Sequence, residues 1–451
     1  MRLLIVDFPA LGLDFALRAV KAGHKVKLAI KQERKTEHVG RGLVDVVDDF
    51  RPWLAWADLV VATDNTKYII ELDAHRKRGG LVIASSPDVA SWEHDRQTGQ
   101  RVFRRAGVPT LPAVEFDNYD KAIAYVSRTM KRYVSKPNGS DSNDKALSYC
   151  ANGPADLIYM LNRWKKQHKL KNSFVLQEFQ TGIEMGVSGW FGPQGFVGCW
   201  EENFEFKKLM NDDMGVQTGE QGTILRYVKH SKLAGKVLKP LTRQLHAAGY
   251  VGDVDVNCII DDEGRPWPLE FTTRLGWPAF NLQMALHKGD VVQWLHDLTQ
   301  GKAKVPFSLD QVAIGVVLSV PDYPYSHATQ KEVVGVPIYG ITRGLWPHVH
   351  PCEMMIAKAP CQIGEKIVEQ ELPATAGDYV LVMTSTGTSI QEIRRAVYGK
   401  LNRIKRQMPS NPMYRTDIGQ RLAQELPKLQ SMGYALGLSY PMASTASPSR
   451  T

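Results

Sequence analysis

The chain has 451 residues, of which 43% are hydrophobic and 23% charged, and its formal net charge is +9. This length exceeds what one hydrophobic core serves, and the composition is typical of a soluble globular protein with about three domains. No apolar run approaches the roughly 20 residues of a membrane span, and the first residues lack a small-residue cleavage site, so we expect a cytoplasmic protein without a membrane partner.

Residues 1–90 alternate apolar strands with helical patterns. "MRLLIVDF" precedes the helical pattern and strand of "DFALRAVKAGHKVKLAI", and "WADLVVAT" and "LVIASS" continue the alternation. Such an order predicts a parallel, Rossmann-like α/β domain at the N-terminus. The stretch that follows, "SWEHDRQTGQRVFRRAG" (91–107), has the pattern of a helix.

Residues 115–185 are expected to form a small βαβ-like unit with strands "RYVSKP" and "SFVLQEF". Lys136 ends the first strand, and Lys145 follows the polar loop "NGSDSND". Two ammonium groups and the N–H groups of such a loop suit the phosphates of a nucleotide. A solvated loop with incidental lysines is the alternative interpretation.

A hinge is expected at "VLQEFQTGIE" (175–184), where an apolar strand leaves the core. Gln177 and Glu178 precede a turn, and Glu184 follows it. Backbone groups and an amide at such a hinge can face an adenine edge, while a carboxylate further on accepts hydrogen bonds from ribose hydroxyls. Any amphipathic strand before a Thr-Gly turn looks similar, so the signal is weak when taken alone.

Residues 186–305 are expected to alternate strands with loops. The polar stretch "FKKLMNDDMGVQTGEQGT" (206–223) is too long for a simple connection, which predicts a functional loop with Lys207 as its phosphate-facing charge. The strands "GDVDVNCII" and "RPWPLEF" are joined by the turn "DDEG" and form a predicted hairpin.

The predicted hairpin carries the most specific pattern. Alternation places five oxygen-bearing side chains on one face: Asp253, Asp255, Asn257, Glu270 and Thr272. Oxygen ligands from paired strands suit Mg²⁺ together with substrate phosphates. Arg274 follows and could hold a phosphate or acyl group bidentately. A structural salt bridge between Glu270 and Arg274 is the alternative.

Residues 306–436 change to "QVAIGVVLSV", "YVLVMTST" and the helix "SIQEIRRAVYGKLNRI", which predicts an α+β end domain, and the polar residues 437–451 suggest a disordered tail. "HVHPCE" places His348, His350 and Cys352 on one strand face, an arrangement that is usually chance but could bind a metal. The basic run 394–407 is usually a solvated helix face, although it leaves contact with nucleic acid open.

The five cysteines include no C-x-x-C pair, which argues against a disulfide framework and against a cysteine-based zinc site; they are Cys150, Cys199, Cys258, Cys352 and Cys361.

These pieces, in this order, resemble the ATP-grasp ligases, and specifically the phosphoribosylamine–glycine ligases (glycinamide ribonucleotide synthetases). The similarity runs from about residue 90 to about residue 425 and rests on "LEFTTRLGWP", "QTGEQGT" after "FKK", "AIGVVLSVPDYP", "YVLVMTSTGTSIQEIRRAVYGKLNRI" and "MYRTDIGQRL". The resemblance implies an N-terminal pre-ATP-grasp domain (1–90), an ATP-grasp domain (91–305) with a small lid (115–185) and a large subdomain (186–305), and a C-terminal α+β domain.

The resemblance also implies roles for individual residues. The ATP-binding set would be Arg96, Lys136, Lys145, Gln177, Glu178, Phe179, Gln180 and Glu184. The metal ligands would be Glu270 and Thr272, with Asn257 compensating for threonine in place of the family's asparagine. Lys207 and Arg274 would face the reacting phosphate, and the substrates would contact Gln217, Thr218, Gly219 and Trp277.

Three stretches depart from the family. The glycine-rich loop that receives the sugar phosphate reads "DFPALGLDFAL", a later G-P-E motif reads "ATDNT", and acidic residues after the arginine are replaced in "GWPAF". All three belong to the family's amine-substrate pocket. We therefore expect ATP-dependent ligation of glycine or another amino acid to an amine other than phosphoribosylamine.

Two alternatives stay open: a true phosphoribosylamine–glycine ligase of purine biosynthesis, and a non-catalytic ATP-binding or nucleic-acid-associated protein. The resemblance implies ATP and Mg²⁺ as cofactors, with Mn²⁺ as a substitute metal. Partners would be a small carboxylate and a small amine, which a nucleotide or nucleic acid could carry, and the chain would be a monomer or a homodimer.

Overall fold

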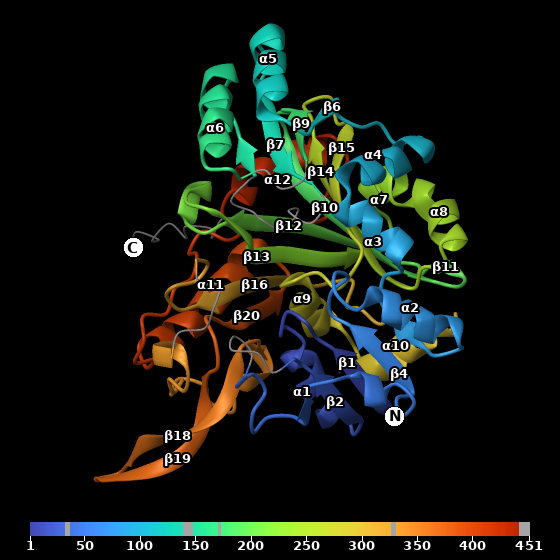
Figure 1. The fold of residues 1–451 in the computed structure, drawn as a ribbon. Helices are drawn as coiled ribbons and strands as arrows, with labels where there is room; N and C mark the ends of the chain where they lie inside the picture. The colour runs from blue at the N-terminus through green and yellow to red at the C-terminus, as the bar shows by residue number, and fades with distance from the viewer. Residues whose placement is uncertain (32–36, 139–147, 170–172, 326–330, 442–451) are drawn as a thin grey trace, which may run out of the picture.

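The computed structural model describes residues 1–31, 37–138, 148–169, 173–325 and 331–441. Its described strands form four sheets, and the largest of them runs through the centre of the molecule (Figure 1). Among these residues, no helix has both the length and the apolar character needed to cross a membrane.

The N-terminal sheet has the strand order β3-β2-β1-β4-β5, and every pair in it is parallel. Its strands are β1 (Arg2–Val6), β2 (Lys25–Ala29), β3 (Val46–Val47), β4 (Leu59–Ala62) and β5 (Val82–Ile83). The helices of this region are α1 (Leu13–Lys21), α2 (Ile69–Lys77) and α3 (Pro87–His94). The apolar runs are buried on both sides, as expected for parallel strands, so the predicted α/β fold is confirmed.

The helix expected at 91–107 is wrong in one respect, because it is broken at Asp95. Asp95 is extended, and its side chain accepts hydrogen bonds from the backbone N–H groups of Gln97 and Thr98, which caps a new helix, α4 (Arg96–Arg105). The break matters for the site, since it makes Arg96 the first residue of α4.

A small sheet, called here the lid sheet, has the order β6-β9-β7-β8. It contains β6 (Ala113–Phe116), β7 (Tyr133–Pro137), β8 (Tyr149–Cys150) and β9 (Phe174–Glu178), and it carries α5 (Tyr119–Thr129) and α6 (Pro154–Lys166). The expected βαβ-like unit is split, since β9 lies between β6 and β7 and runs antiparallel to both. Phe116, Tyr133, Leu157 and Phe174 belong to a hydrophobic core that is separate from the main core.

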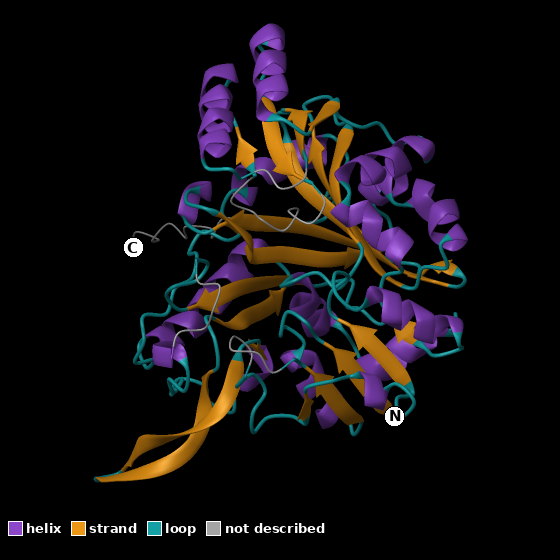
Figure 2. Cartoon of the chain, in the orientation of Figure 1, coloured by secondary structure: helices purple, strands orange, loops and turns teal. Residues whose placement is uncertain are grey.

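The central sheet is nine-stranded and follows the order β15-β14-β10-β12-β13-β16-β20-β17, with β11 paired to β10. Long strands of this sheet cross the middle of the molecule (Figure 2). Its strands are β10 (Ile183–Gly192), β11 (Gly195–Phe196), β12 (Trp200–Lys208), β13 (Gln217–Val228), β14 (Gly252–Ile260), β15 (Pro266–Thr272), β16 (Val312–Ser319), β17 (Val349–Pro351) and β20 (Tyr379–Gly387). The sheet therefore continues across residue 306, where a domain boundary was expected. The boundaries themselves stay a prediction.

The expectation of strands separated by loops in 186–305 is wrong, because four helices lie there: α7 (Lys232–Val237), α8 (Thr242–Ala247), α9 (Ala279–Leu286) and α10 (Val291–Thr299). Helix α9 is short and buried along most of its length, so its sequence lacks the polar face that would indicate a helix. The expected C-terminal helix is α11 (Ile390–Lys405), capped by Ser389, and α12 (Leu422–Ser431) follows.

A long hairpin, β18 (Met354–Ile363) and β19 (Lys366–Thr375), projects from the body of the molecule (Figure 1). The sequence patterns did not indicate this hairpin. Near the C-terminus, the side chain of Leu438 is buried and the carbonyl of Ser439 accepts a hydrogen bond from the N–H of Ile390, while residues 442–451 lie outside the described part.

Candidate active site

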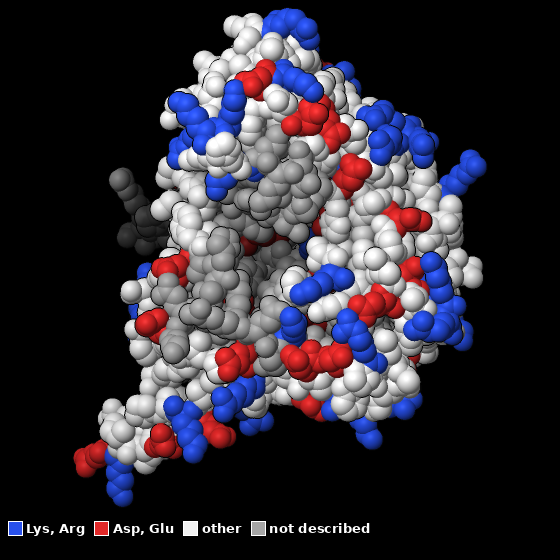
Figure 3. Space-filling model, viewed as in Figure 1, with Lys and Arg blue, Asp and Glu red and all other residues white. Residues whose placement is uncertain are grey.

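A cleft of about 550 Å³ is lined by residues of both the lid sheet and the central sheet. The face in Figure 3 is hollowed at its centre, where this cleft opens. The lining includes most of the residues singled out in the sequence: Arg96, Lys136, Gln177, Glu178, Phe179, Gln180, Glu184, Lys207, Gln217, Gly219, Glu270, Thr272, Arg274 and Trp277. Thr218 and Asn257 are buried just behind the wall, and Lys145 lies outside the described residues.

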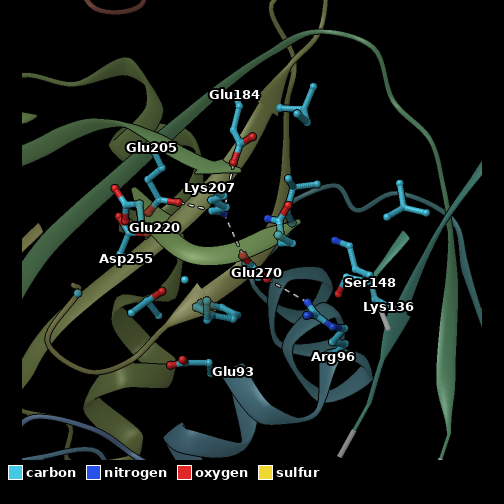
Figure 4. A pocket seen from close by; sticks show the side chains of 18 of the residues that line it. Glu93, Arg96, Lys136, Ser148, Glu184, Glu205, Lys207, Glu220, Asp255 and Glu270 are labelled. Carbon is cyan, nitrogen blue, oxygen red and sulfur yellow. Dashed lines mark hydrogen bonds and ion pairs between the residues drawn. The ribbon is translucent and has the colours of Figure 1, made fainter. Parts of the chain in front are cut away.

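Lys207 occupies the middle of the cleft wall. Its Nζ lies 3.3 Å from Glu184 Oε1, 2.9 Å from Glu205 Oε2 and 3.2 Å from Glu270 Oε1 (Figure 4). Burial alone would lower the pKa of Lys207, but the charges of Glu205, Glu184 and Glu270 outweigh burial and raise this pKa well above its ordinary value. The lysine is therefore a fixed positive charge at the centre of the site.

The expectation of a long loop at 206–223 is wrong. Strand β12 runs to Lys208 and β13 begins at Gln217, so only a short connection lies between them. An irregularity in the strand pairing lies between Phe206 and Lys208. Strand pairing, which a polar and glycine-punctuated sequence does not reveal, holds Lys207 in place.

Glu270 is held by cations from two directions. Besides Lys207, its carboxylate contacts the guanidinium of Arg96, with 3.1 Å between Arg96 Nη1 and Glu270 Oε2. Arg274 lies instead against Glu93, with 3.3 Å between Arg274 Nε and Glu93 Oε1. The alternative of a structural salt bridge between Glu270 and Arg274 is therefore wrong, and Arg274 remains on the cleft wall.

Lys136 extends from β7 toward the hinge. Its Nζ donates to Gln177 Oε1 at 2.9 Å. Burial, followed by the charge of Arg96, lowers the pKa of Lys136 to about 7. A lysine in this state gains its full charge when an anion enters, which suits a residue that binds phosphate.

The hinge combines apolar walls with polar edges. Leu111 and Val134 line the cleft beside it. Glu178 forms an ion pair with Lys131, at 2.6 Å between Oε1 and Nζ, and the guanidinium of Arg132 covers the ring of Phe179 at 3.4 Å from its centroid. These contacts fix the hinge beside the apolar side chains of Leu111 and Val134, the kind of surface against which an adenine ring packs.

The residues expected to bind the metal are paired across β14 and β15, Asn257 opposite Glu270 and Asp255 opposite Thr272. The amide nitrogen of Asn257 donates to Glu184 Oε1 at 2.7 Å and to Glu205 Oε2 at 2.8 Å. Its Oδ1 is buried and has no hydrogen-bond partner. An orphaned amide oxygen beside a carboxylate and a hydroxyl fits Mg²⁺, which prefers oxygen ligands.

Acidic residues deeper in the cleft were not recognised in the sequence. Glu201, Asn203, Glu205 and Lys207 alternate along β12, and Glu220 faces the same cleft from β13. The alternation in "WEENFEFKK" was the signal that could have found the first four, because every second residue of a strand shares a face.

Burial raises the pKa values of these deep carboxyl groups. It raises the pKa of Glu201 to about 8 together with the charge of Asp253, and it raises the pKa of Asp253 to about 6. The pKa values of Glu220 and Asp255 are raised well above their ordinary range by burial and by the charge of Glu205. Carboxylates crowded in this way disfavour one another's charge.

The three stretches that depart from the resembled family are joined by hydrogen bonds, and one of them lines the cleft through Gly276, Trp277 and Ala279. Thr63 of "ATDNT" donates from its Oγ1 to Oδ1 of Asp7 at 2.7 Å, and Asp7 opens "DFPALGLDFAL". The carbonyl of Thr63 accepts from Nε1 of Trp277, in "GWPAF", at 3.1 Å. The departures are therefore one connected change in the molecule.

The possible metal cluster at "HVHPCE" is wrong. His350 is fully buried, with Nδ1 2.7 Å from Asp14 Oδ2 and Nε2 2.8 Å from Thr384 Oγ1. The described residues contain no group of three or more His, Cys, Asp or Glu side chains arranged to hold a metal ion. His350 thus joins the N-terminal helix α1 to β20.

Comparison with known proteins gives both sequence and structural relatives. No family model matches the chain. The phosphoribosylamine–glycine ligase of Ralstonia nicotianae is 24% identical over 364 residues, which are 78% of this chain and 81% of that protein. The crystal structure of phosphoribosylamine–glycine ligase from Thermotoga maritima has a TM-score of 0.70 at 18% identity and covers 92% of this chain and 100% of that one. The chain has the ATP-grasp fold.

A second structural relative is the biotin carboxylase domain of the Hydrogenobacter thermophilus 2-oxoglutarate carboxylase, determined in complex with MgADP, ADP and bicarbonate. It has a TM-score of 0.59 at 12% identity and covers 96% of this chain and 98% of that one. The predicted ATP-grasp fold and the predicted resemblance to phosphoribosylamine–glycine ligase are both confirmed, and so is the classification as an ATP-grasp ligase that forms C–N bonds.

Proposed function

We propose that this ATP-grasp ligase joins glycine or another amino acid to an amine other than phosphoribosylamine. The observation that carries the proposal is the contrast within one cleft. Lys136, Arg96, Lys207 and Glu270 line the cleft together. The cleft is also lined by Gly276, Trp277 and Ala279 of one departing stretch, which is hydrogen-bonded through Thr63 to the other two.

The first step would form an acyl phosphate. A carboxylate oxygen of the amino acid attacks the γ-phosphorus of ATP, the bond from that phosphorus to the bridging oxygen breaks, and ADP leaves with the electron pair. Lys136 and Arg96 would neutralise the phosphates, and Lys207 and Arg274 would hold the transferred group. Mg²⁺ held by Glu270, Asn257 and Thr272 would neutralise further phosphate charge.

The second step would form the amide. The lone pair of an uncharged amine attacks the acyl carbon, the bond from this carbon to the phosphate oxygen breaks, and inorganic phosphate leaves while the amine proton passes to water. This chemistry asks the protein for position and charge, which agrees with a site made of lysines, arginines and carboxylates. A cleft that encloses the acyl phosphate would also limit its hydrolysis.

The test is ADP release from Mg·ATP across a panel of amino acids, with and without phosphoribosylamine. We expect ADP release that depends on an amino acid and is indifferent to phosphoribosylamine. Release that requires glycine and phosphoribosylamine together would contradict the proposal and favour the second candidate, a true phosphoribosylamine–glycine ligase, which the similarity to the Thermotoga maritima enzyme supports. Tight ATP binding without any ADP release would identify a binding protein.

A further inference from the structure

Four carboxyl groups at the inner end of the cleft form what we call the inner acidic pocket: Glu201 of β12, Glu220 of β13, and Asp253 and Asp255 of β14. All four side chains are buried, with exposed fractions of 1%, 6%, 3% and 9% in that order, yet all four line the cleft. Glu220 and Asp255 lie next to Glu205 and Lys207 in Figure 4.

The partners of this pocket are neutral. Asn203 Nδ2 donates to Asp255 Oδ2 at 2.8 Å and to Glu201 Oε1 at 3.2 Å. Gln283 Nε2 donates to Glu201 Oε2 at 2.7 Å and to Asp253 Oδ2 at 2.8 Å, and Ser188 donates to Asp253 Oδ1 at 2.6 Å.

The described part of the chain contains no salt bridge to any of the four carboxyl groups. The neighbouring carboxylates of Glu184, Glu205 and Glu270 differ, because they share the ammonium of Lys207. That contact also demonstrates that a primary ammonium group fits among acidic side chains of this cleft.

Glu220 has a buried oxygen atom that no group of the described chain satisfies. Its Oε1 is buried and has no hydrogen-bond partner, although the side chain faces the cleft. Burying a carboxyl group without a partner is costly unless a ligand supplies one. The group that satisfies a carboxylate best is a cationic N–H donor.

A glycine in β10 allows side chains of the two neighbouring strands, β12 and β14, to come close to each other. Strand β10 lies between β12 and β14 and presents Gly186 opposite both Asn203 and Asn257, and Ser188 opposite both Glu201 and Asp255. A Cβ atom at Gly186 would lie 2.0 Å from Asn203 Oδ1. The absence of a side chain there is what lets Asn203 reach the carboxylate of Asp255.

We propose that the inner acidic pocket binds a positive charge of the amine substrate, so that this substrate is a diamine or polyamine. One ammonium group would occupy the pocket and stay protonated, while another amino group of the same molecule, in its uncharged form, attacks the acyl carbon as described above. A phosphate group on the amine would find no cationic side chain in this pocket and would meet acidic oxygen atoms instead. This inference rests on the proposed ligase function.

The test measures binding directly, with the full chain saturated with Mg²⁺ and a non-hydrolysable ATP analogue. Calorimetric titration at low ionic strength would use spermidine, putrescine, propylamine and ribose 5-phosphate as probes. We expect affinity to fall in that order, with no binding of ribose 5-phosphate. Glu220→Gln should raise the Kd for spermidine at least tenfold, and Glu369→Gln, an exposed change on β19, should leave it unaltered.

Three results would overturn the inference. They are a flat ranking of the probes on the unaltered chain, equal spermidine binding in Glu220→Gln and Glu369→Gln, and displacement of spermidine by excess Mg²⁺ with the same dependence on Glu220. The ranking needs no variant, so it decides the matter even if Glu220→Gln does not fold. If spermidine binds but no ADP is released, the proposed ligase function is wrong and the proposed binding pocket is not affected. If ADP is released with a neutral or anionic amine, the proposed role of the pocket is wrong and the ligase function is not affected.

Discussion

The two ends of the cleft balance their charges in opposite ways. At the nucleotide end, Lys207 and Arg96 meet Glu270 in close ion pairs. At the inner end, Glu201 and Asp253 share an amide donor from Gln283 and have no cation from the described chain. At the first end the described chain itself supplies the opposite charges, whereas at the second end we propose that a substrate supplies them.

The largest effect is expected at the nucleotide end. Glu270→Gln removes the carboxylate that contacts Lys207 and Arg96 and that we propose as a metal ligand. We expect the rate of ADP release to fall about 10²–10³-fold, the size typical of losing one preorganised charge in an active site. Steady-state assays with the amino acid that supports turnover measure it. Glu369→Gln is the matched control, and near-normal turnover in Glu270→Gln would mean that the two ends do not differ as described.

The next largest effect is expected on the Mg²⁺ concentration that the reaction requires. Asn257→Ala removes the buried amide that donates to Glu184 and Glu205 and whose oxygen is free for Mg²⁺. We expect the Mg²⁺ concentration for half-maximal ADP release to rise about 10–100-fold, as for other groups that hold or orient a metal. The exposed Asn162→Ala is the control, and an unchanged Mg²⁺ requirement would remove Asn257 from the site.

A smaller effect is expected from adding a side chain at Gly186 of β10. Gly186→Ala pushes a methyl group against Asn203, so we expect a loss of about 1–3 kcal/mol in the free energy of unfolding, the usual cost of overpacking. Urea denaturation measures it. Gly235→Ala in α7, where a Cβ meets nothing within 4 Å, should be neutral or stabilising. Equal stability of the two variants would show that β10 can yield and that its glycine is not needed.

The smallest expected effect is the uptake of one proton when ATP binds. Because the pKa of Lys136 is about 7 in the free chain, this lysine is mostly neutral at pH 8, and bound phosphates would raise its pKa. ATP binding should therefore take up most of one proton at pH 8, and ATP affinity should fall as pH rises above 7. Titration calorimetry in two buffers of different ionisation enthalpy measures the uptake.

Lys136→Arg is the control for this proton, since an arginine stays charged and its variant should take up none. Proton uptake that is equal in both proteins would mean that another group titrates. Uptake that is absent in the unaltered chain would mean that Lys136 is already charged before ATP binds.

The sequence predicted the site best where the alternation within a short pair of strands was enough to place the side chains. Alternation in the hairpin was enough to place Asn257 and Glu270 on one face, and in the structure the two residues are paired across β14 and β15. The same reasoning failed for Lys207, because polar strands with glycines read as a loop until their partners are known. It also missed α9, since a helix buried on nearly all sides has no amphipathic period.

The inner acidic pocket could not be predicted from short segments of the sequence, for a different reason. Its members come from three strands that are far apart in the sequence, and only the sheet order brings Glu220 and Asp253 to one cavity. Burial and the absence of ion pairs, which decide what the carboxylates can bind, are properties of the assembled fold.

The separate core beneath the lid sheet has a mechanical consequence. Phe116, Tyr133 and Phe174 pack within the lid and not into the main core, so the lid can rotate as a rigid body without exposing either core. The contacts that such a rotation would change include polar ones, those of Arg96 with the carbonyl of Pro137 and the side chain of Asn138. Opening of this hinge, rather than bond formation, is then the step expected to limit how fast products leave.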